Sequence, residues 1–448
     1  MVALEWSDPK SARSKAYCRF CENRTSQSPC FSVRKGSDLD RWCRCECGVL
    51  NSVDLLNAPD YFITEGENSF YMRLDQADSA DGVIGPATRY FPGGSLPFLD
   101  VGCGLGFAAD YMKWKGVEAQ GIDPSESAQL AARFLSMPIN EVGADVDDLR
   151  GSGDNFVFLS EVIEHVDSPR ALLDSLTAVA GRGGLLLVTT PAADFVTPHN
   201  EQAKVLAAIG SGQHLCLVGE PHLRQMLEQA GFAGVETWVD SGRLFAVAGH
   251  STIPRPSEFD RDLYRSYLQE RLSRRLDSGT KDSDLVVRAF GSRLFKELVN
   301  SGKYEAAELV VQALEPVFSR LDLDLNDPGA LLESYWARID DDLGMPNPRL
   351  APMSLPMFCY LRAIQIANLQ PSSSLIDEYL EAAVELSLLY AGGSAWQTVD
   401  FEVASLRDVV SRARRDLGLE TSDAGRLERA RLAVWRLSRR VRGKLLSH

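Results

Sequence analysis

The sequence predicts an α/β protein with a doubly wound, mostly parallel central sheet, a small cysteine-rich module before it and an all-α region after it. Three observations carry this prediction. Apolar strand-like runs alternate with helical stretches between residues 65 and 250, as in repeated β-α units. Six of the nine cysteines lie between residues 18 and 47, and strand signals are absent after residue 255. A chain of 448 residues has room for several domains, which we place at residues 12–60, 65–250 and 255–448.

Composition narrows the class of protein. The formal net charge is −15, which disfavours nucleic-acid binding because phosphate contacts require clustered Lys and Arg. No apolar run approaches the roughly 20 residues that cross a bilayer, and the first residues lack the basic and apolar regions of a secretion signal. We therefore expect a soluble, cytoplasmic protein with reduced cysteines.

The cysteines of the N-terminal module predict a structural zinc site. Cys18 and Cys21 form a C-x-x-C pair, and a second group, Cys43, Cys45 and Cys47, follows later in the module. Four thiolates from two tight turns make a closed tetrahedral site, which suits zinc and leaves no open position for chemistry. The glycine after Cys47 permits a tight turn, so Cys47 is the expected ligand and its partner is Cys43 or Cys45. The alternative is a set of reduced thiols without metal.

The predicted sheet begins with a strand at Pro97–Val101, which leads into a glycine-rich turn and then a helix over Phe107–Lys115. Glycine at positions 102, 104 and 106 lets a ligand approach the backbone closely, with amide N–H groups converging on it. Such turns also serve merely to join a strand to a helix, so the turn alone does not decide between the two.

Further strands alternate with helices along this region. We expect strands at Val117–Ile122, Ile139–Val142, Phe156–Leu159 and Leu185–Thr190, and a closing hairpin at Gly234–Val239 and Leu244–Ala248. Phe156–Leu159 is apolar throughout, as expected of a strand that is buried on both faces. Helices are expected at Ser125–Ser136, Ala171–Ala180 and Glu220–Ala230.

An acidic residue ends the second strand, about twenty residues after the glycine turn. Asp123 is therefore placed to accept hydrogen bonds from the vicinal ribose hydroxyls of a nucleotide-type ligand. Two ligands fit this arrangement, a dinucleotide and S-adenosylmethionine. The G-x-G-x-G spacing differs from the G-x-G-x-x-G that seats a pyrophosphate. Asp100, before the turn, would repel a pyrophosphate and suit an ammonium or sulfonium group.

Four motifs in this order resemble those of the class I S-adenosylmethionine-dependent methyltransferases. They are Phe98–Gly106, Gly121–Ser125, Leu159–Val166 and Gly183–Pro191, and the resemblance covers roughly residues 70–250. It implies a Rossmann-like methyltransferase sheet in which the methionine moiety is held by Asp100 and by the amides of Gly102, Cys103, Gly104 and Gly106. It further implies that Asp123 with Pro124 takes the ribose, that Asp145 or Val146 contacts the adenine, and that Ser160 and Glu161 line the methyl-donor side.

The chemistry of the acceptor side is less constrained. Methyl transfer is an in-line displacement, so the protein supplies alignment and, for a hydroxyl acceptor, a base or a metal. Glu161, Glu164 and His165 would share one face of a helix. With His214 they resemble the set that binds Mg²⁺ or Mn²⁺ in ubiquinone-type and small-RNA 2′-hydroxyl methyltransferases. The same motif also occurs in metal-free methyltransferases, where the histidine packs locally. His165 or His214 is the candidate general base, and His222 is expected to be a helix-surface residue without a role.

The order of the modules bears on the acceptor. A cysteine-rich module fused to such a methyltransferase resembles the enzymes that tailor sugars, including nucleotide-sugar C-methyltransferases and surface-polysaccharide methyltransferases. The second Rossmann-like domain of the sugar C-methyltransferases is not visible after residue 250. This favours O-methylation of a sugar, glycan or related small molecule. The alternatives are sugar C-methylation, a metal-dependent RNA 2′-O-methyltransferase and a non-catalytic scaffold.

The C-terminal region is expected to be a helical bundle that supplies no catalytic residue. A cap over the acceptor pocket, a homodimerisation unit and a docking platform all fit it. Its last stretch, residues 425–446, combines an apolar stripe with a strongly basic face. Such a helix fits peripheral contact with the anionic inner membrane face, pairing as a short coiled coil, or simply the end of the bundle.

Overall fold

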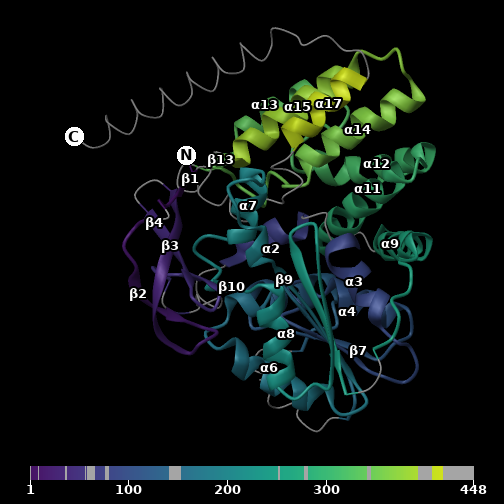
Figure 1. Ribbon diagram of the computed structural model, residues 1–448. Coiled ribbons are helices and arrows are strands. Elements are labelled where there is room, and N and C mark those ends of the chain that lie inside the picture. Colours follow the sequence, from purple (N-terminus) through teal and green to yellow (C-terminus); the bar gives the residue numbers. More distant parts are fainter. Residues whose placement is uncertain are drawn as a thin grey trace.

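Figure 1 shows the computed structural model of the chain, with the N-terminal strands to one side of the central sheet and the C-terminal helices above it. The structure describes residues 2–8, 10–35, 38–55, 57, 66–75, 80–140, 153–250, 253–276, 281–340, 345–391 and 406–416. The expected adenine contacts Asp145 and Val146 and the basic segment 425–446 lie outside these residues.

The central sheet has six strands in the order β11-β12-β9-β8-β6-β7. Four of them run parallel, namely β6 (Phe98–Val101), β7 (Ala119–Ile122), β8 (Phe156–Ser160) and β9 (Leu185–Pro191). The antiparallel hairpin of β11 (Gly234–Asp240) and β12 (Arg243–Gly249) completes one edge. This confirms the predicted α/β fold with its parallel strands and closing hairpin.

The apolar strands face two cores because successive side chains of a strand point to opposite sides of the sheet. In β8, Phe156 and Phe158 belong to one core, whereas Val157 and Leu159 belong to the other. The first core is lined by α4 (Phe107–Trp114) and α5 (Glu126–Leu135), and the second by α6 (Pro169–Ala180) and α8 (Glu220–Gln229). Burial on both faces explains why these strands are apolar throughout.

Two of these helices begin at serine caps. Oγ of Ser125 accepts the amide of Ala128 at 3.3 Å, and Oγ of Ser168 accepts that of Ala171 at 3.3 Å. Each serine satisfies an amide that has no partner within its own helix. The remaining elements of the region are α2 (Gly66–Asp75), η1 (Ala80–Ile84), α3 (Gly85–Tyr90), η3 (Ile163–His165), η4 (Ala193–Phe195) and α7 (Gln202–Ile209).

The strand expected at Ile139–Val142 is not formed in its described part. Ile139 makes an isolated parallel bridge to Gly121, and residues 141–142 lie outside the residues that the structure describes. One bridge brings the chain back beside β7 without extending the sheet.

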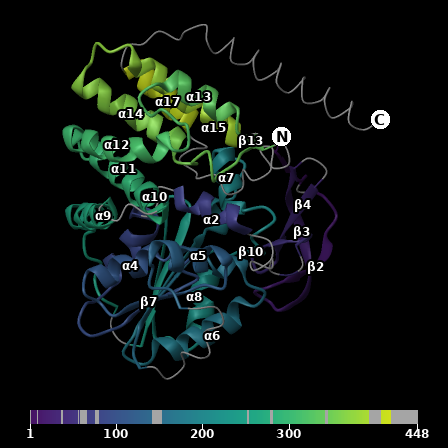
Figure 2. The same ribbon diagram turned by 180° about the vertical axis from the view of Figure 1, so that it is seen from behind.

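The N-terminal module is a second sheet that continues into the central region. Strands β1 (Val2–Trp6), β3 (Asn23–Lys35), β4 (Asp38–Cys45) and β5 (Leu50–Ser52) lie side by side, with β2 (Ser14–Cys18) paired to β3. The last strand of this sheet is β10 (Cys216–Leu217), which pairs with β5. Figure 2 shows from behind that the module lies beside the central sheet. Backbone hydrogen bonds therefore join two segments that are far apart in the sequence.

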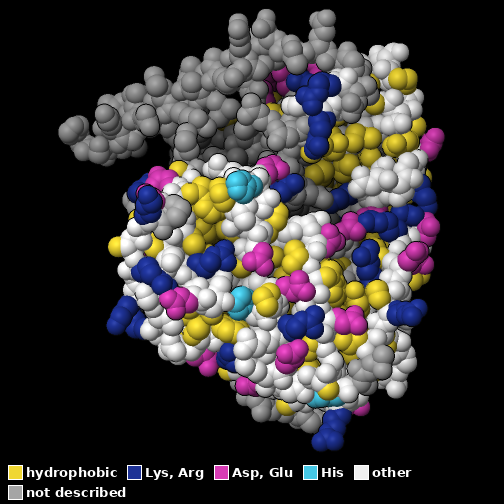
Figure 3. Space-filling view, viewed as in Figure 1, with side chains coloured by type: hydrophobic (Ala, Val, Ile, Leu, Met, Phe, Trp, Pro, Cys, Tyr) yellow, Lys and Arg dark blue, Asp and Glu magenta, His cyan; other side chains and the backbone are white. Residues whose placement is uncertain are grey.

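The C-terminal region is helical, as predicted. Its helices are α9 (Arg261–Leu276), α10 (Lys281–Val286), η5 (Val287–Gly291), α11 (Ser292–Asn300), α12 (Tyr304–Ser319), α13 (Pro328–Trp336), α14 (Leu355–Leu369), α15 (Leu375–Ala391) and α17 (Leu406–Asp416). Among the described helices, none is long and apolar enough to span a bilayer. Basic and acidic side chains are interspersed over the described part of the face in Figure 3.

One short hairpin interrupts these helices. The strands β13 (Ile339–Asp340) and β14 (Met345–Pro346) pair in a region where the sequence predicted helices and no strand. The amide of Asn347 extends the pairing by donating to the carbonyl of Arg338 at 3.0 Å. The helix therefore ends at Trp336 because the chain beyond it finds a partner strand, which helical periodicity does not reveal.

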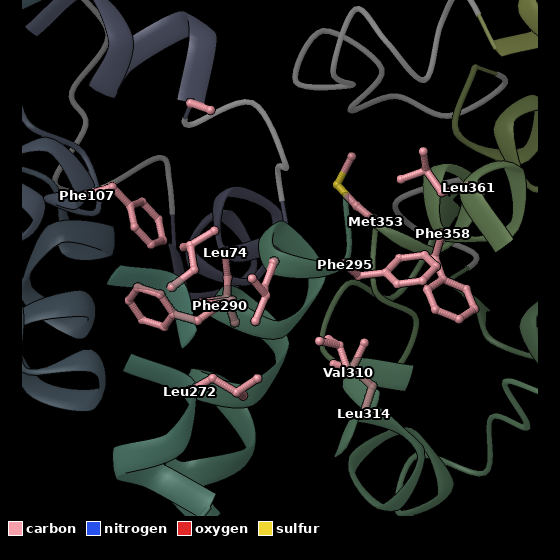
Figure 4. Close-up of a cluster of buried hydrophobic side chains, with 14 of the residues drawn as sticks. Leu74, Phe107, Leu272, Phe290, Phe295, Val310, Leu314, Met353, Phe358 and Leu361 are labelled. Atoms are coloured by element: carbon pink, nitrogen blue, oxygen red, sulfur yellow. The ribbon is translucent and has the colours of Figure 1, made fainter. Parts of the chain in front are cut away.

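The C-terminal helices share an apolar core with the central region. Figure 4 shows Leu74 of α2, Phe107 of α4 and Phe290 of η5 gathered in this core. The ring centroids of Phe107 and Phe290 lie 5.6 Å apart in an edge-to-face arrangement. The helical region is thus packed onto the segment that follows the glycine turn.

A buried polar contact joins the same two regions. The hydroxyl of Tyr267 in α9 donates to Oδ2 of Asp110 in α4 at 2.6 Å, and Nε of Arg271 lies 3.1 Å from that oxygen. Burial raises the pKa of Asp110 despite the nearby guanidinium of Arg271. Both partners therefore come from α9, one turn of helix apart.

We predict that Tyr267→Phe lowers the free energy of unfolding by about 1 to 2 kcal/mol, because the buried Asp110 loses a hydrogen-bond donor. Urea unfolding followed by circular dichroism measures this change. Tyr17→Phe, at a tyrosine that is 42% exposed, is the matched control and should leave stability unchanged. An unaltered unfolding midpoint for Tyr267→Phe would contradict the contribution assigned to this hydrogen bond.

Candidate functional site

The glycine turn after β6 places three residues in the left-handed region of backbone conformation. The φ angle is +71° at Gly102, +54° at Gly104 and +77° at Gly106. A Cβ atom at Gly102 would lie only 2.3 Å from Cγ2 of Val162, which follows β8. Glycine is therefore required at 102 both by the backbone and by the close approach of the neighbouring segment.

The turn's amides are directed inward, which differs from the expectation that they converge on a ligand. The amides of Gly102 and Cys103 donate to the carbonyl of Ile122 at 2.8 and 3.2 Å. The amide of Gly106 donates to the carbonyl of Cys103 at 2.9 Å. The amide of Gly104 donates to Oδ2 of Asp123 at 2.8 Å. These four donors already have acceptors, so the turn mainly offers a ligand close approach.

Asp123 reaches back from the end of β7 to the glycine turn. Besides the amide of Gly104, its carboxylate accepts the amide of Ser125 at 2.8 Å, across Pro124. The side chain is partly exposed. The structure therefore brings Asp123 and the turn together. A ribose diol bound here would replace the amide of Gly104 as the hydrogen-bond donor to this carboxylate.

Asp100 in β6 lies buried below the turn, with 2% of its surface exposed. Burial, with a smaller contribution from the charge of Asp123, raises the pKa of Asp100 to about 8. Burial also raises the pKa of the neighbouring Cys103 thiol well above its ordinary value. A cationic group bound close to Asp100 would favour its ionised form.

Ser160 and Glu161 follow β8 at the same edge of the sheet. Oγ of Ser160 lies 2.8 Å from Oγ1 of Thr189, and that threonine donates to Oε1 of Glu161 at 3.2 Å. Nε of Arg243 lies 3.2 Å from the same carboxylate oxygen. Glu161 has a φ of +55°, which is uncommon for a residue other than glycine. Its carboxylate is thus held by partners from β9 and β12.

Glu164, His165 and His214 form a compact group beside this edge. Their ligand atoms all lie within 4.8 Å of one another. Glu164 and His165 lie in the single turn η3, so the expected helix face is not formed. Glu161 is absent from the group because its carboxylate contacts Arg243. Three of the four residues predicted as a divalent-cation set therefore come together.

Hydrogen bonds to backbone carbonyls orient both imidazoles. Nδ1 of His165 lies 3.3 Å from the carbonyl of Gln213, and Nδ1 of His214 lies 3.0 Å from that of Ala208. We assign the proton to Nδ1 in each ring, which leaves the lone pair on Nε2. The rings meet edge to face, with 4.6 Å between centroids.

Burial sets the protonation of this group. It lowers the pKa of His214 to about 4, and with the neighbouring His214 it lowers the pKa of His165 well below its ordinary value. Burial, with the charge of Glu161, raises the pKa of Glu164 well above its ordinary value. Oε2 of Glu164 accepts from Oγ1 of Thr190 at 2.9 Å, while Oε1 is buried without a hydrogen-bond partner among the described residues. At neutral pH both imidazoles are neutral, the state that accepts a proton or binds a metal.

The N-terminal module brings four of the predicted cysteines together. The sulfur atoms of Cys18 and Cys47 lie 3.7 Å apart, those of Cys21 and Cys45 lie 3.8 Å apart, and all four fall within 4.8 Å of one another. Cys43 instead contacts Oγ of Ser14 at 3.8 Å. It lies two residues further back along β4, about 7 Å from Cys45. The geometry therefore selects Cys45 as the partner of Cys47.

Several residues of these sites were not identified from the sequence. His222, expected to be a helix-surface residue without a role, contacts Phe20 edge to face at 5.1 Å and hydrogen-bonds to the carbonyl of Cys47. Thr189 and Thr190 hold Glu161 and Glu164, yet in the sequence they only end an apolar strand. For Thr189 and Thr190, the only signal in the sequence is their position at the end of a strand, directly before Pro191. His222 and the threonines reach partners in other elements, so periodicity could not assign them.

Comparisons with known proteins agree on the central region. Residues 83–237 match the model of a family described as a methyltransferase domain. Ubiquinone biosynthesis O-methyltransferase of Coxiella burnetii (strain Dugway 5J108-111) is 28% identical over 182 residues, covering 38% of this chain and 74% of the relative. The protein of the same name from Brucella ovis is 33% identical over 101 residues, covering 21% of this chain and 41% of the relative.

Solved structures are more distant. A SAM-dependent methyltransferase from Archaeoglobus fulgidus is 19% identical with a TM-score of 0.29, covering 36% of this chain and 88% of that chain. A TM-score this low carries no functional weight. The family match spans the glycine turn, Asp123 and the edge of β8 that bears Glu164 and His165.

We predict that Asp100→Asn changes the pH dependence of stability. A carboxyl whose folded-state pKa is raised to about 8 destabilises the fold progressively as pH rises from about 4, because the unfolded chain ionises first. The stability of Asp100→Asn relative to wild type should therefore rise by up to about 1.4 kcal/mol per pH unit between about pH 4 and about pH 8. Urea unfolding across this window measures the difference.

Glu118→Gln, at an exposed carboxyl before β7, is the control. Its stability relative to wild type should not follow the same slope. If Asp100→Asn and Glu118→Gln show the same pH dependence, Asp100 is not the buried acid described above.

Proposed function

Because residues 83–237 form a class I S-adenosylmethionine-dependent methyltransferase domain, we propose that this protein methylates a hydroxyl oxygen of a sugar, glycan or related small molecule. The observation that carries the proposal is the pair of neutral imidazoles, His165 and His214, beside Oε1 of Glu164, which accepts no hydrogen bond from the described residues and lies 3.9 Å from Nε2 of His165. A hydroxyl acceptor must lose its proton during transfer, and this group can take it or hold a cation that assists its loss. The relatives named O-methyltransferases support oxygen as the acceptor atom.

The residues at the sheet edge fit S-adenosylmethionine. When bound, this cofactor supplies an activated methyl group on a sulfonium sulfur. Asp123 offers a carboxylate to the ribose, and Asp100 offers a buried carboxyl to a cationic group. The glycine turn leaves space for close approach. Ser160 and Glu161 on the donor side, and Asp145 or Val146 at the adenine, stay predictions.

Two arrangements can remove the acceptor's proton. In the first, His165 accepts it on Nε2 while its Nδ1 proton is held by the carbonyl of Gln213. In the second, Glu164, His165 and His214 hold Mg²⁺ or Mn²⁺, which would lower the pKa of the acceptor hydroxyl. The second arrangement would give Oε1 of Glu164 a ligand, where the described residues offer it no hydrogen bond, and a buried oxygen without one is costly.

The four clustered cysteines support structural zinc. Four sulfur atoms within 4.8 Å of one another match the donor set of a closed tetrahedral site. The hydrogen bond with Cys47 lowers the pKa of Cys18 to about 5, so one thiolate is already favoured. His222 and Phe20 then connect the cysteine cluster to α8. Zinc would stabilise a module whose strands have a small core of their own.

An RNA acceptor has less support than a small molecule. The net charge of −15 opposes binding to a phosphate backbone. The described part of the face in Figure 3 carries interspersed basic and acidic side chains. The module order that resembles sugar-tailoring enzymes favours a sugar or glycan, and the named relatives favour oxygen over carbon.

We predict that His214→Gln reduces methyl transfer by about a hundredfold or more, because it removes a member of the proton-removing group. Transfer is measured with labelled S-adenosylmethionine and a panel of hydroxylated sugars and other small hydroxyl compounds. His199→Gln, at an exposed loop histidine, should retain wild-type activity. Full activity of His214→Gln would contradict the proposed role of the imidazole pair.

Removal of divalent cations separates the two arrangements. With Glu164, His165 and His214 as ligands, EDTA should abolish transfer, and Mg²⁺ or Mn²⁺ should restore it. The zinc content of the same samples must be unchanged, so that loss of the cysteine site is not the cause. Transfer that is indifferent to EDTA would remove the cation and leave His165 as the base.

We predict that Cys21→Ser loses bound zinc, because the site then has three thiolates. Metal analysis under reducing conditions should find about one zinc per chain in the wild type and in Cys43→Ser, whose sulfur lies outside the cluster. Equal zinc content in Cys21→Ser and the wild type would exclude this site. A loss in Cys43→Ser alone would mean that Cys43 is the ligand.

A further inference from the structure

The end of helix α2 approaches the glycine turn at Gly104, whose amide binds Asp123. A Cβ atom at Gly104 would lie 3.7 Å from Nη1 of Arg73. The charge of Arg73 also contributes to the lowered pKa of His165. This arginine therefore lies near both the turn and His165, between which the methionine part of the cofactor is expected.

The glycine turn does not offer a hydrogen-bond donor to the carboxylate of the cofactor from the amides described above. S-adenosylmethionine carries an amino-acid carboxylate, and the amides of Gly102, Cys103, Gly104 and Gly106 already donate within the protein. Asp100 does not suit this group, because its ionised form would repel a second carboxylate. A guanidinium binds carboxylates well because its fork of N–H donors matches the two oxygens.

The C-terminal helices hold α2 in this place. Nη2 of Arg288 in η5 donates to Oδ2 of Asp75, the last residue of α2, at 2.6 Å. The side chains of the pair are 3% and 0% exposed. The amide of Met353 donates to the same carboxylate at 3.2 Å. The end of α2 is therefore anchored by two separate segments of the C-terminal region.

Arg293 ties the same helix to the start of α4. Its Nη1 donates to the carbonyl of Leu74 at 2.9 Å, and its guanidinium lies 4.0 Å from the ring centroid of Phe107. Phe107 follows Gly106 directly, so Arg293 spans the two segments that flank the turn. Figure 4 shows Leu74 and Phe107 in the same apolar cluster as Phe290.

We propose that Arg73 binds the amino-acid carboxylate of the cofactor and that the C-terminal helices position it by anchoring Asp75 through Arg288. The helical region thereby acts on the cofactor site rather than as a separate unit. This inference rests on the assignment of S-adenosylmethionine as cofactor and is independent of the acceptor. Arg73 is a cofactor-binding residue, and Arg288 and Asp75 are positioning residues.

Calorimetry with two ligands tests the role of Arg73. S-adenosylhomocysteine retains the carboxylate, and its decarboxylated analogue lacks only that group. The wild type should bind S-adenosylhomocysteine about tenfold to a hundredfold more tightly than the analogue. Arg73→Gln should lose this preference by weakening S-adenosylhomocysteine alone, and Arg73→Lys should retain part of it. Arg89→Gln, at an exposed arginine of α3, is the charge-matched control and should keep the preference.

A loss of affinity for both ligands in Arg73→Gln, or for neither, would overturn the proposal. A wild-type protein that binds neither ligand would refute the cofactor assignment itself, which is a different failure. The double variant Asp75→Asn/Arg288→Gln tests the positioning role without leaving a lone buried charge. It should reduce the preference, and adding Arg73→Gln should reduce it little further. Full preference in a folded double variant would refute the role of the C-terminal helices.

Discussion

Parallel hydrogen bonding of β6 to β7 on one side and β8 on the other is the constraint on which the site depends. It aligns the carboxyl ends of these strands, so that residues distant in the sequence emerge at one edge. The amides of Gly102 and Cys103 continue this bonding to the carbonyl of Ile122, which carries Asp123 back to the turn. The next strand pair, β8 with β9, sets Ser160 beside Thr189 in the same way.

The parts of the molecule that could be predicted from sequence are those whose cause is local. Glycine is required at position 102 by its own φ angle and by one neighbouring side chain. The strand β8 is apolar throughout because it is buried on both faces. The four parallel strands of the central sheet, its closing hairpin and the helical character of the C-terminal region follow from such patterns, whereas the strands of the N-terminal module were not predicted. The contact between Asp123 and the glycine turn could also be predicted, because neighbouring parallel strands bring their carboxyl ends together.

The parts that could not be predicted depend on partners from other elements. The sequence gives no reason to separate Glu161 from Glu164. In the structure Glu161 contacts Arg243 of β12 and is not part of the cluster with His165 and His214. The sequence does not distinguish Cys43 from Cys45 as a ligand. In the structure Cys45 lies beside Cys21, whereas Cys43 contacts Ser14. The strand pair at Ile339 and Met345 replaced a helix for the same reason. Arg73 and Arg288 had no pattern at all, since their positions arise from the packing of α2 against η5.

The pairing of β5 with β10 also bears on how the chain folds during synthesis. Residues 50–52 leave the ribosome long before residues 216–217, so β5 has an open edge while most of the central region is being made. Closing that edge requires a contact of very high sequence separation, which is slow to form. The module can gather its cysteines early, yet its sheet is completed only when the segment after His214 has arrived.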